Sequence, residues 1–210
     1  MSTVLRWTLR PVLAGFAAAL LAASAQAQDD AADATWLADV LELELGATVA
    51  DIGAGSGGLS VAVAPHVGPE GHIYATELGP ESVASLAQAL DSAGLRTVTV
   101  LEGHFDRTNL PPECCDAVFI RFVYHHFADP PAMNRSLWQS LKRGGRLAVI
   151  DFAPRGPEAA QPSGRAEGDQ HGVTAATLQA ELEQAGFIVL STEQRPDRRV
   201  QVVAMKAPER

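Results

Sequence analysis

Residues Val49–Ser60, with the sequence VADIGAGSGGLS, constrain the fold of this chain more than any other segment. A short apolar run ends at Asp51, glycine then occupies every second position from Gly53 to Gly57, and an apolar helical pattern follows. This pattern predicts a buried strand, a tight turn and a helix. Such junctions are typical of open α/β sheets, whose ligands bind at the carboxyl ends of the strands.

The rest of the chain repeats this alternation of helix and strand. Helices are expected over 33–45, 58–67, 79–94, 129–145 and 174–187, and strands over 47–53, 72–78, 97–103, 115–124, 146–153, 187–195 and 199–207. Nearly continuous apolar strands between helices favour a parallel sheet covered on both faces. The last connection is too short for a helical crossover, so the final strand should be reversed. We therefore predict an α/β fold: a doubly wound, mostly parallel seven-stranded sheet.

The first 27 residues have a different character. Arg6 and Arg10 precede a run of about fifteen apolar or small residues, and Ala25–Ala27 then has the small-x-small pattern of a cleavage site. This order predicts a secretory signal peptide over 1–27, followed by one domain over 28–210, exported and most simply periplasmic. An uncleaved membrane anchor and a misassigned start codon are the alternatives, although the run is short for a bilayer of roughly 30 Å.

Charge and cysteine content limit the partners of the domain. The formal net charge is −9, and loss of Arg6 and Arg10 would make it −11. An acidic domain does not suit nucleic acid, which favours clustered Lys and Arg.

The two cysteines, Cys114 and Cys115, are adjacent, so they do not join distant segments, and we expect two small half-buried residues at the start of a strand. No residues have the spacing of a metal site.

The glycine turn fits two cofactor signatures. Gly53, Gly55 and Gly58 match the dinucleotide fingerprint G-x-G-x-x-G, with Glu77 at the end of the next strand to hold ribose hydroxyls. Asp51, however, would repel a pyrophosphate and would attract an ammonium or sulfonium group. The second interpretation, with Asp51 followed by Gly53, Gly55 and Gly57, therefore favours S-adenosylmethionine.

Several segments in this order resemble one family. VADIGAGSG, Glu77 in YATEL, CDAVFIRFVYHHFADP, LKRGGRLAVIDF and LQAELEQAGF are together similar to the class I S-adenosylmethionine-dependent methyltransferases of the seven-stranded type. The resemblance covers residues 36–207 and implies that Asp51, the three glycines and Glu77 bind the methyl donor. It places the adenine-contacting segment at residues 103–105, where the family usually has an acid and this chain has His104.

The end of the fourth expected strand carries the candidates for acceptor chemistry. In some small-molecule O-methyltransferases a histidine in a similar context is a general base, and His125 falls on that position. We expect Arg121 to contact the donor's carboxylate or pair with a nearby acid. Tyr124 is a candidate contact of the substrate or the cofactor, and His126 is a weaker candidate for catalysis. Asp151 could hold the acceptor or a metal, although a single acid without partners is no metal site. His171, at the end of the aperiodic and flexible segment expected over 154–172, is placed to fold over the cleft.

The acceptor itself is not encoded in any recognisable motif. We expect methyl transfer to a small molecule. A non-catalytic ligand-binding protein on the same fold and a nicotinamide-dependent oxidoreductase remain the other hypotheses.

Overall fold

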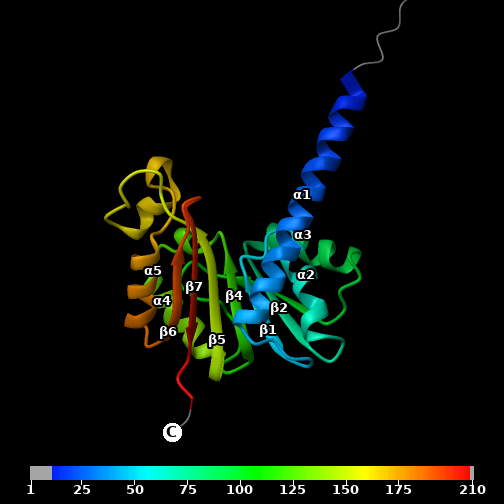
Figure 1. The fold of residues 1–210 in the computed structure, drawn as a ribbon. Coiled ribbons are helices and arrows are strands. Elements are labelled where there is room, and N and C mark those ends of the chain that lie inside the picture. The colour runs from blue at the N-terminus through cyan, green and yellow to red at the C-terminus, as the bar shows by residue number, and fades with distance from the viewer. Residues whose placement is uncertain (1–10, 209–210) are drawn as a thin grey trace, which may run out of the picture.

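A computed structural model describes the backbone of residues 11–208 and the side chains of residues 26–208. Within these residues seven strands form a single sheet in the order β3-β2-β1-β4-β5-β7-β6 (Figure 1). The strands are β1 (Thr48–Ile52), β2 (His72–Leu78), β3 (Val98–Gly103), β4 (Cys115–Arg121), β5 (Leu141–Phe152), β6 (Ile188–Gln194) and β7 (Arg199–Met205). In this sheet β7 runs antiparallel to both β5 and β6, which confirms the predicted reversed strand.

Helices cover both faces of the sheet, as the apolar strands predicted. The helices are α1 (Pro11–Val40), α2 (Gly58–Val67), α3 (Pro80–Ser92), α4 (Pro130–Ser140) and α5 (Ala175–Gln184). Along β4, Ala117 and Phe119 pack with α1 and α2, whereas Val118 and Ile120 pack with α4 and α5. Because successive strand side chains point to opposite faces, each strand contributes to two cores. The doubly wound architecture is confirmed.

Helices α1 and α4 each end five residues earlier than their sequence patterns predicted. At Val40 the side chain of Arg146 donates a hydrogen bond to the backbone carbonyl at 2.9 Å and also pairs with Glu42, whose φ is 52°. This contact satisfies a carbonyl that the helix end leaves open. Helix α4 stops at Ser140, and residues 141–145 join β5 instead. A Cβ atom at Gly145 would lie 2.9 Å from the carbonyl oxygen of Asp116, so the glycine allows close strand pairing.

Helix α1 continues without a break across the expected cleavage position after Ala27. From residue 26 onward, the buried side chains of α1 are those of Asp30, Asp33, Ala34 and Leu37. Within the described residues, the helices include none with both the length and the hydropathy of a membrane span.

The two cysteines lie at the start of β4, as expected. Cys114 is half-buried, Cys115 is buried, and both are free thiols.

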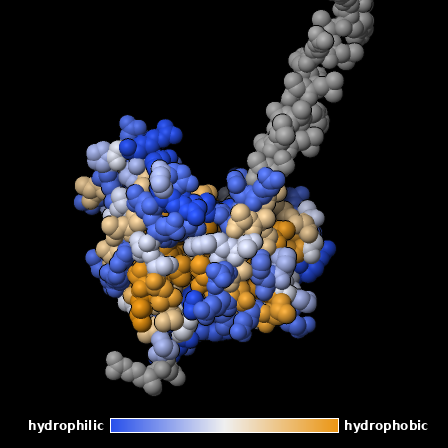
Figure 2. Space-filling model, in the orientation of Figure 1, coloured by the Kyte–Doolittle hydropathy of each residue, from blue (hydrophilic) through white to orange (hydrophobic). Residues whose placement is uncertain are grey.

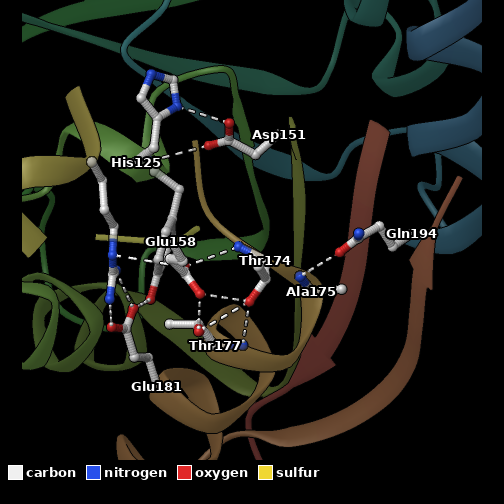
Figure 3. A network of polar contacts seen from close by, with 10 residues as sticks. His125, Asp151, Glu158, Thr174, Ala175, Thr177, Glu181 and Gln194 are labelled. Atoms are coloured by element: carbon white, nitrogen blue, oxygen red, sulfur yellow. Dashed lines mark hydrogen bonds and ion pairs between the residues drawn. The ribbon is translucent and has the colours of Figure 1, made fainter. Parts of the chain in front are cut away.

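Segment 154–172 contains two short 3₁₀ turns, at Pro162–Ala166 and Gly168–Gln170. Its Arg165 is buried and binds both carboxylate oxygens of Glu181 in α5, at 2.8 and 3.2 Å (Figure 3 shows Glu181). Immediately after the segment, the backbone N–H of Val173 donates to the carbonyl of Phe152 in β5 at 2.9 Å. Figure 2 shows mostly hydrophilic surface over this segment, which explains why its sequence lacks an apolar period. Its expected flexibility stays a prediction.

Candidate active site

The glycine turn lies at the carboxyl end of β1, between β2 on one side and β4 on the other. This is the point where the strand order reverses, and open α/β sheets bind ligands there. Gly53, Gly55 and Gly57 all have positive φ angles, of 71°, 58° and 80°. L-residues with side chains rarely adopt this conformation, so the turn depends on glycine.

The three glycines differ in what surrounds them. A Cβ atom at Gly53 would lie 2.6 Å from Val123, and one at Gly57 would lie 2.5 Å from Leu90. At Gly55 the corresponding position has no atom within 4 Å. Gly53 and Gly57 therefore let the protein pack against itself, whereas Gly55 presents bare backbone to an open space that a ligand can fill.

Asp51 is the charged group beneath this turn. It is 2% exposed at the end of β1, and Ser60 at the start of α2 donates a hydrogen bond to its Oδ2 at 2.6 Å. Burial raises the pKa of Asp51 to about 7, although the Ser60 hydrogen bond and the positive charge of Arg121 act in the opposite direction. A cationic ligand in the adjoining cavity, which Asp51, Gly53 and Gly55 line, would favour the ionised carboxylate.

Glu77 faces the same turn from the end of β2. Its Oε1 accepts a hydrogen bond from the backbone N–H of Gly55 at 2.7 Å, and its Oε2 accepts one from Leu78 at 3.0 Å. The side chain is partly exposed, so its two oxygens can also accept from neighbouring hydroxyl groups of a ligand. This arrangement suits a ribose diol.

A largely apolar pocket continues from Glu77 toward β3. Gly53, His104, Phe105 and Met133 line it together with Glu77. Phe105 is 69% exposed, which is unusual for a large aromatic side chain and leaves its ring available to a flat ligand group. The structure thus brings the predicted adenine segment, 103–105, next to the predicted ribose and glycine residues.

Arg121 pairs with two acids that the sequence analysis missed. Its Nη2 lies 2.6 Å from Oδ1 of Asp30, and its Nη1 donates to Oδ2 of Asp33 at 3.1 Å. Both acids belong to α1, nearly ninety residues earlier, and no local pattern links them to Arg121. Of the two roles expected for Arg121, pairing with a nearby acid is therefore the one observed, although its side chain also lines the cavity beside Asp51.

Tyr124 is held inside the protein, and its predicted contact with a substrate stays a prediction. The residue is fully buried, its hydroxyl donates to Oε2 of Glu181 at 2.9 Å, and it accepts from Nδ2 of Asn134 at 2.7 Å. Burial and the negative charge of Glu181 raise the pKa of Tyr124 well above its ordinary value. Its role is to join the short 3₁₀ turn Tyr124–His126 to α4 and α5.

Asp151 is also fully buried, and its predicted contact with a substrate stays a prediction. Its Oδ2 accepts from the backbone N–H of His125 at 3.1 Å, and its Oδ1 lies 2.8 Å from Nδ1 of the same residue (Figure 3). Oδ1 also accepts from the N–H of Phe152. Asp151 is therefore a positioning residue that fixes both the backbone and the ring of His125.

The other ring nitrogen of His125 meets a residue from the distant loop. Its Nε2 lies 2.9 Å from Nε2 of His171, and the ring of His126 lies beside it with centroids 4.0 Å apart. Burial, and then the nearby His125, lowers the pKa of both His126 and His171. His171 thus folds onto the site as expected, and His126 lines the apolar pocket that also contains Gly53.

Comparisons with known proteins agree with this arrangement. A family profile described as "Methyltransferase domain" matches residues 50–149. A demethylmenaquinone methyltransferase of Listeria monocytogenes is 27% identical over 112 residues, which cover 53% of this chain and 47% of the relative. The chain therefore spans about half the length of the curated relatives it matches.

Solved structures share the fold over most of the chain. A SAM-dependent methyltransferase from Aquifex aeolicus superposes with a TM-score of 0.70 at 25% identity, covering 82% of this chain and 89% of that one. A possible exported protein from Bordetella parapertussis superposes with a TM-score of 0.65 at 21% identity, covering 86% and 67%. The matched profile, the seven-stranded sheet with its reversed strand, and the acid–glycine turn agree on what this chain is similar to: the class I S-adenosylmethionine-dependent methyltransferases.

Proposed function

We propose that this protein transfers a methyl group from S-adenosylmethionine to a small-molecule acceptor. The observation that carries the proposal is the pair of acids, Asp51 and Glu77, on either side of the bare backbone of Gly55. When bound, S-adenosylmethionine would supply a methyl group on a positively charged sulfur; the acceptor attacks the methyl carbon in line, and S-adenosylhomocysteine is the leaving group. The protein's task is then to align the acceptor and exclude water.

Local charge separates this cofactor from a dinucleotide. Asp51 and Glu77 are acids, and the charge of the nearby Arg121 is already balanced by Asp30 and Asp33. A pyrophosphate would therefore meet net negative charge, whereas an ammonium group would be attracted. The same residues disfavour the nicotinamide-dependent oxidoreductase.

The histidines mark the acceptor side, because His126 lines the pocket next to Gly53. With Asp151 accepting from Nδ1, the lone pair of His125 lies on Nε2, which is the nitrogen a general base needs. His171 covers that nitrogen at 2.9 Å. General-base catalysis by His125 stays a prediction, and an acceptor hydroxyl would have to displace His171 or transfer its proton through it.

Calorimetric titration of the full chain with S-adenosylmethionine, S-adenosylhomocysteine and NADH tests the cofactor. We expect binding of the two adenosyl ligands, strong weakening in Asp51→Ala, and no binding of NADH. Binding of NADH alone, or of none of the three, would contradict the proposal. Adenosyl binding without turnover on a panel of small hydroxyl, amine and thiol acceptors would favour a non-catalytic binding protein.

We also propose that residues 1–27 are a cleaved export signal and that the domain works in the periplasm. The basic start, the apolar run and the small residues at Ala25 and Ala27 support this. The Bordetella protein of the same fold is itself described as possibly exported. Mass spectrometry of the chain recovered from fractionated cells tests both cleavage and export. We expect the periplasmic fraction to contain a chain whose mass corresponds to an amino terminus at Gln28. An intact chain held in the membrane fraction would favour the anchor.

A further inference from the structure

Three histidines from two separate segments meet beside the cofactor pocket. His125 and His126 belong to the 3₁₀ turn after β4, and His171 ends the segment that follows β5. One ring nitrogen from each can be chosen so that the three atoms lie within 4.8 Å of one another. We propose that these three side chains bind a divalent transition-metal ion of the zinc type.

The spacing of the nitrogens fits such an ion. Imidazole nitrogens bind zinc at 2.0–2.1 Å, so two of them stand roughly 3.3 Å apart in a tetrahedral site. Nε2 of His125 and Nε2 of His171 lie 2.9 Å apart. Without an ion, one of these two nitrogens must carry a proton that the other accepts. An ion between them would use both lone pairs, and the exposed His126 ring, after rotation toward the ion, would supply the third ligand.

Asp151 provides the support that metal-binding histidines usually have. Ligating histidines almost always donate their other ring N–H to a carboxylate or carbonyl, which fixes the tautomer and increases the basicity of the ligand. Asp151 accepts from Nδ1 of His125 at 2.8 Å and holds the backbone of that residue as well. The lone pair on Nε2 is thereby directed at His171.

The backbone around His171 is built to bring it into this position. Gly172 has a φ of 126°, and a Cβ atom there would lie 2.4 Å from the carbonyl oxygen of Phe152, so only glycine allows the chain to approach the end of β5 so closely. The Phe152 ring packs against both His125 and His171, with centroids 4.8 and 4.9 Å apart. This apolar wall shields the nitrogens from water on one side.

Three protein ligands leave a fourth position open, as in catalytic zinc sites. Because His126 lines the pocket shared with Gly53 and Glu77, the open position faces the acceptor side. An ion there would bind an acceptor oxygen and lower the pKa of its hydroxyl, a role that would replace proton removal by His125. This last step rests on the proposed methyl transfer, whereas ion binding does not.

The test uses the full chain without an affinity tag, stripped of metal with a chelator. We titrate Zn²⁺ by calorimetry and Co²⁺ by visible absorption, and we measure S-adenosylhomocysteine binding on the same samples. We expect one ion per chain and the intense visible bands of a four- or five-coordinate Co²⁺ site. His171→Ala should weaken Zn²⁺ binding at least tenfold, and Asp151→Asn should weaken it roughly 10- to 100-fold.

His66→Ala is the matched control, because His66 lies in α2 and outside the cluster. It should bind Zn²⁺ as the unmodified chain does. Circular dichroism of each variant distinguishes loss of a metal ligand from loss of the fold. The Co²⁺ spectrum of the unmodified chain tests the site independently of any variant. Absence of one-to-one binding by the unmodified chain, or full retention of binding in a folded His171→Ala variant, would overturn the metal site. Neither result changes the S-adenosylhomocysteine titration, which reports separately on the cofactor proposal.

Discussion

Ser60 donates a hydrogen bond to Asp51 across the glycine turn, with 2.6 Å between Oγ and Oδ2. Both residues are buried, so the hydroxyl is a fixed partner of the carboxylate in place of water. The hydrogen bond favours the charged form, but burial disfavours it more strongly, and the pKa of Asp51 is raised to about 7. Asp51, beneath the glycine turn, therefore gains or loses its negative charge near neutral pH.

Binding of S-adenosylhomocysteine should depend on pH through Asp51. The ligand's ammonium group favours the ionised carboxylate, so affinity should fall as Asp51 takes up a proton below its pKa. Between pH 7.5 and pH 6 we expect the dissociation constant to rise roughly tenfold. Ser60→Ala should move this transition to higher pH, because it removes an interaction that lowers the pKa. A pH-independent affinity in the unmodified chain would contradict this role, and Asp51→Asn should remove the dependence.

Glu77→Ala should weaken binding of the adenosyl ligands without unfolding the protein. Hydrogen bonds to a charged group contribute about 1.5–3 kcal/mol, which corresponds to roughly 10- to 150-fold in affinity. Glu102→Ala is the matched control, since Glu102 is an exposed acid in register with Glu77 on the neighbouring strand. Calorimetry on both variants checks the prediction. Equal affinities would show that Glu77 does not bind the ribose.

Gly53→Ala should mainly lower the stability of the protein, whereas Gly55→Ala should mainly lower its affinity for the cofactor. At Gly53 the new methyl group meets Val123, so stability should fall by more than the roughly 1–2 kcal/mol cost of the left-handed conformation alone. At Gly55 there is no clash, but the methyl group enters the ligand's space, so cofactor affinity should fall most. Thermal unfolding and ligand titration distinguish the two effects.

Val123→Ala provides the second half of that test. Combined with Gly53→Ala, it should recover part of the lost stability, because it removes the methyl groups that clash. Combined with Gly55→Ala, it should recover nothing. Similar rescue of both glycine variants would contradict the assignment of separate packing and binding roles.

The pair of the buried Arg165 and the mostly buried Glu181 should hold the 154–172 segment in place. Replacing Arg165 with leucine leaves the carboxylate of Glu181 without its cationic partner and with the Tyr124 hydroxyl as a hydrogen-bond donor, which should cost up to roughly 3 kcal/mol of unfolding free energy. Arg195→Leu is the control, because Arg195 pairs with Glu193 on the exposed surface, and its replacement should leave the unfolding free energy nearly unchanged.

A double variant, Arg165→Leu with Glu181→Leu, should be more stable than Arg165→Leu alone, because the Glu181 charge that lost its cation is removed; the Tyr124 hydroxyl loses its acceptor, so the recovery should be partial. Chemical denaturation of the three variants gives the comparison. If Arg165→Leu is as harmless as Arg195→Leu, the pair does not anchor the segment.

Local sequence patterns determined most of the fold and the cofactor half of the site. The alternating apolar segments specified the order of helices and strands, and a last connection too short for a crossover specified the reversed β7. Asp51, the glycines and Glu77 were identifiable because the chain passes through the turn and reaches the end of the next strand within about 25 residues. Patterns failed at Gly145, where strand pairing rather than helical period decides the backbone.

The acceptor half of the site was decided only by tertiary structure. Sequence analysis named His125, Asp151 and His171 separately, but the distances that make Asp151 a support and His171 a neighbour of His125 come from packing segments up to 46 residues apart. The same holds for Arg121, whose acids lie on α1, and for Tyr124, whose hydroxyl is buried against α5. The sequence specifies the chemical groups of a side chain, but its burial and its partners depend on which distant segments pack against it.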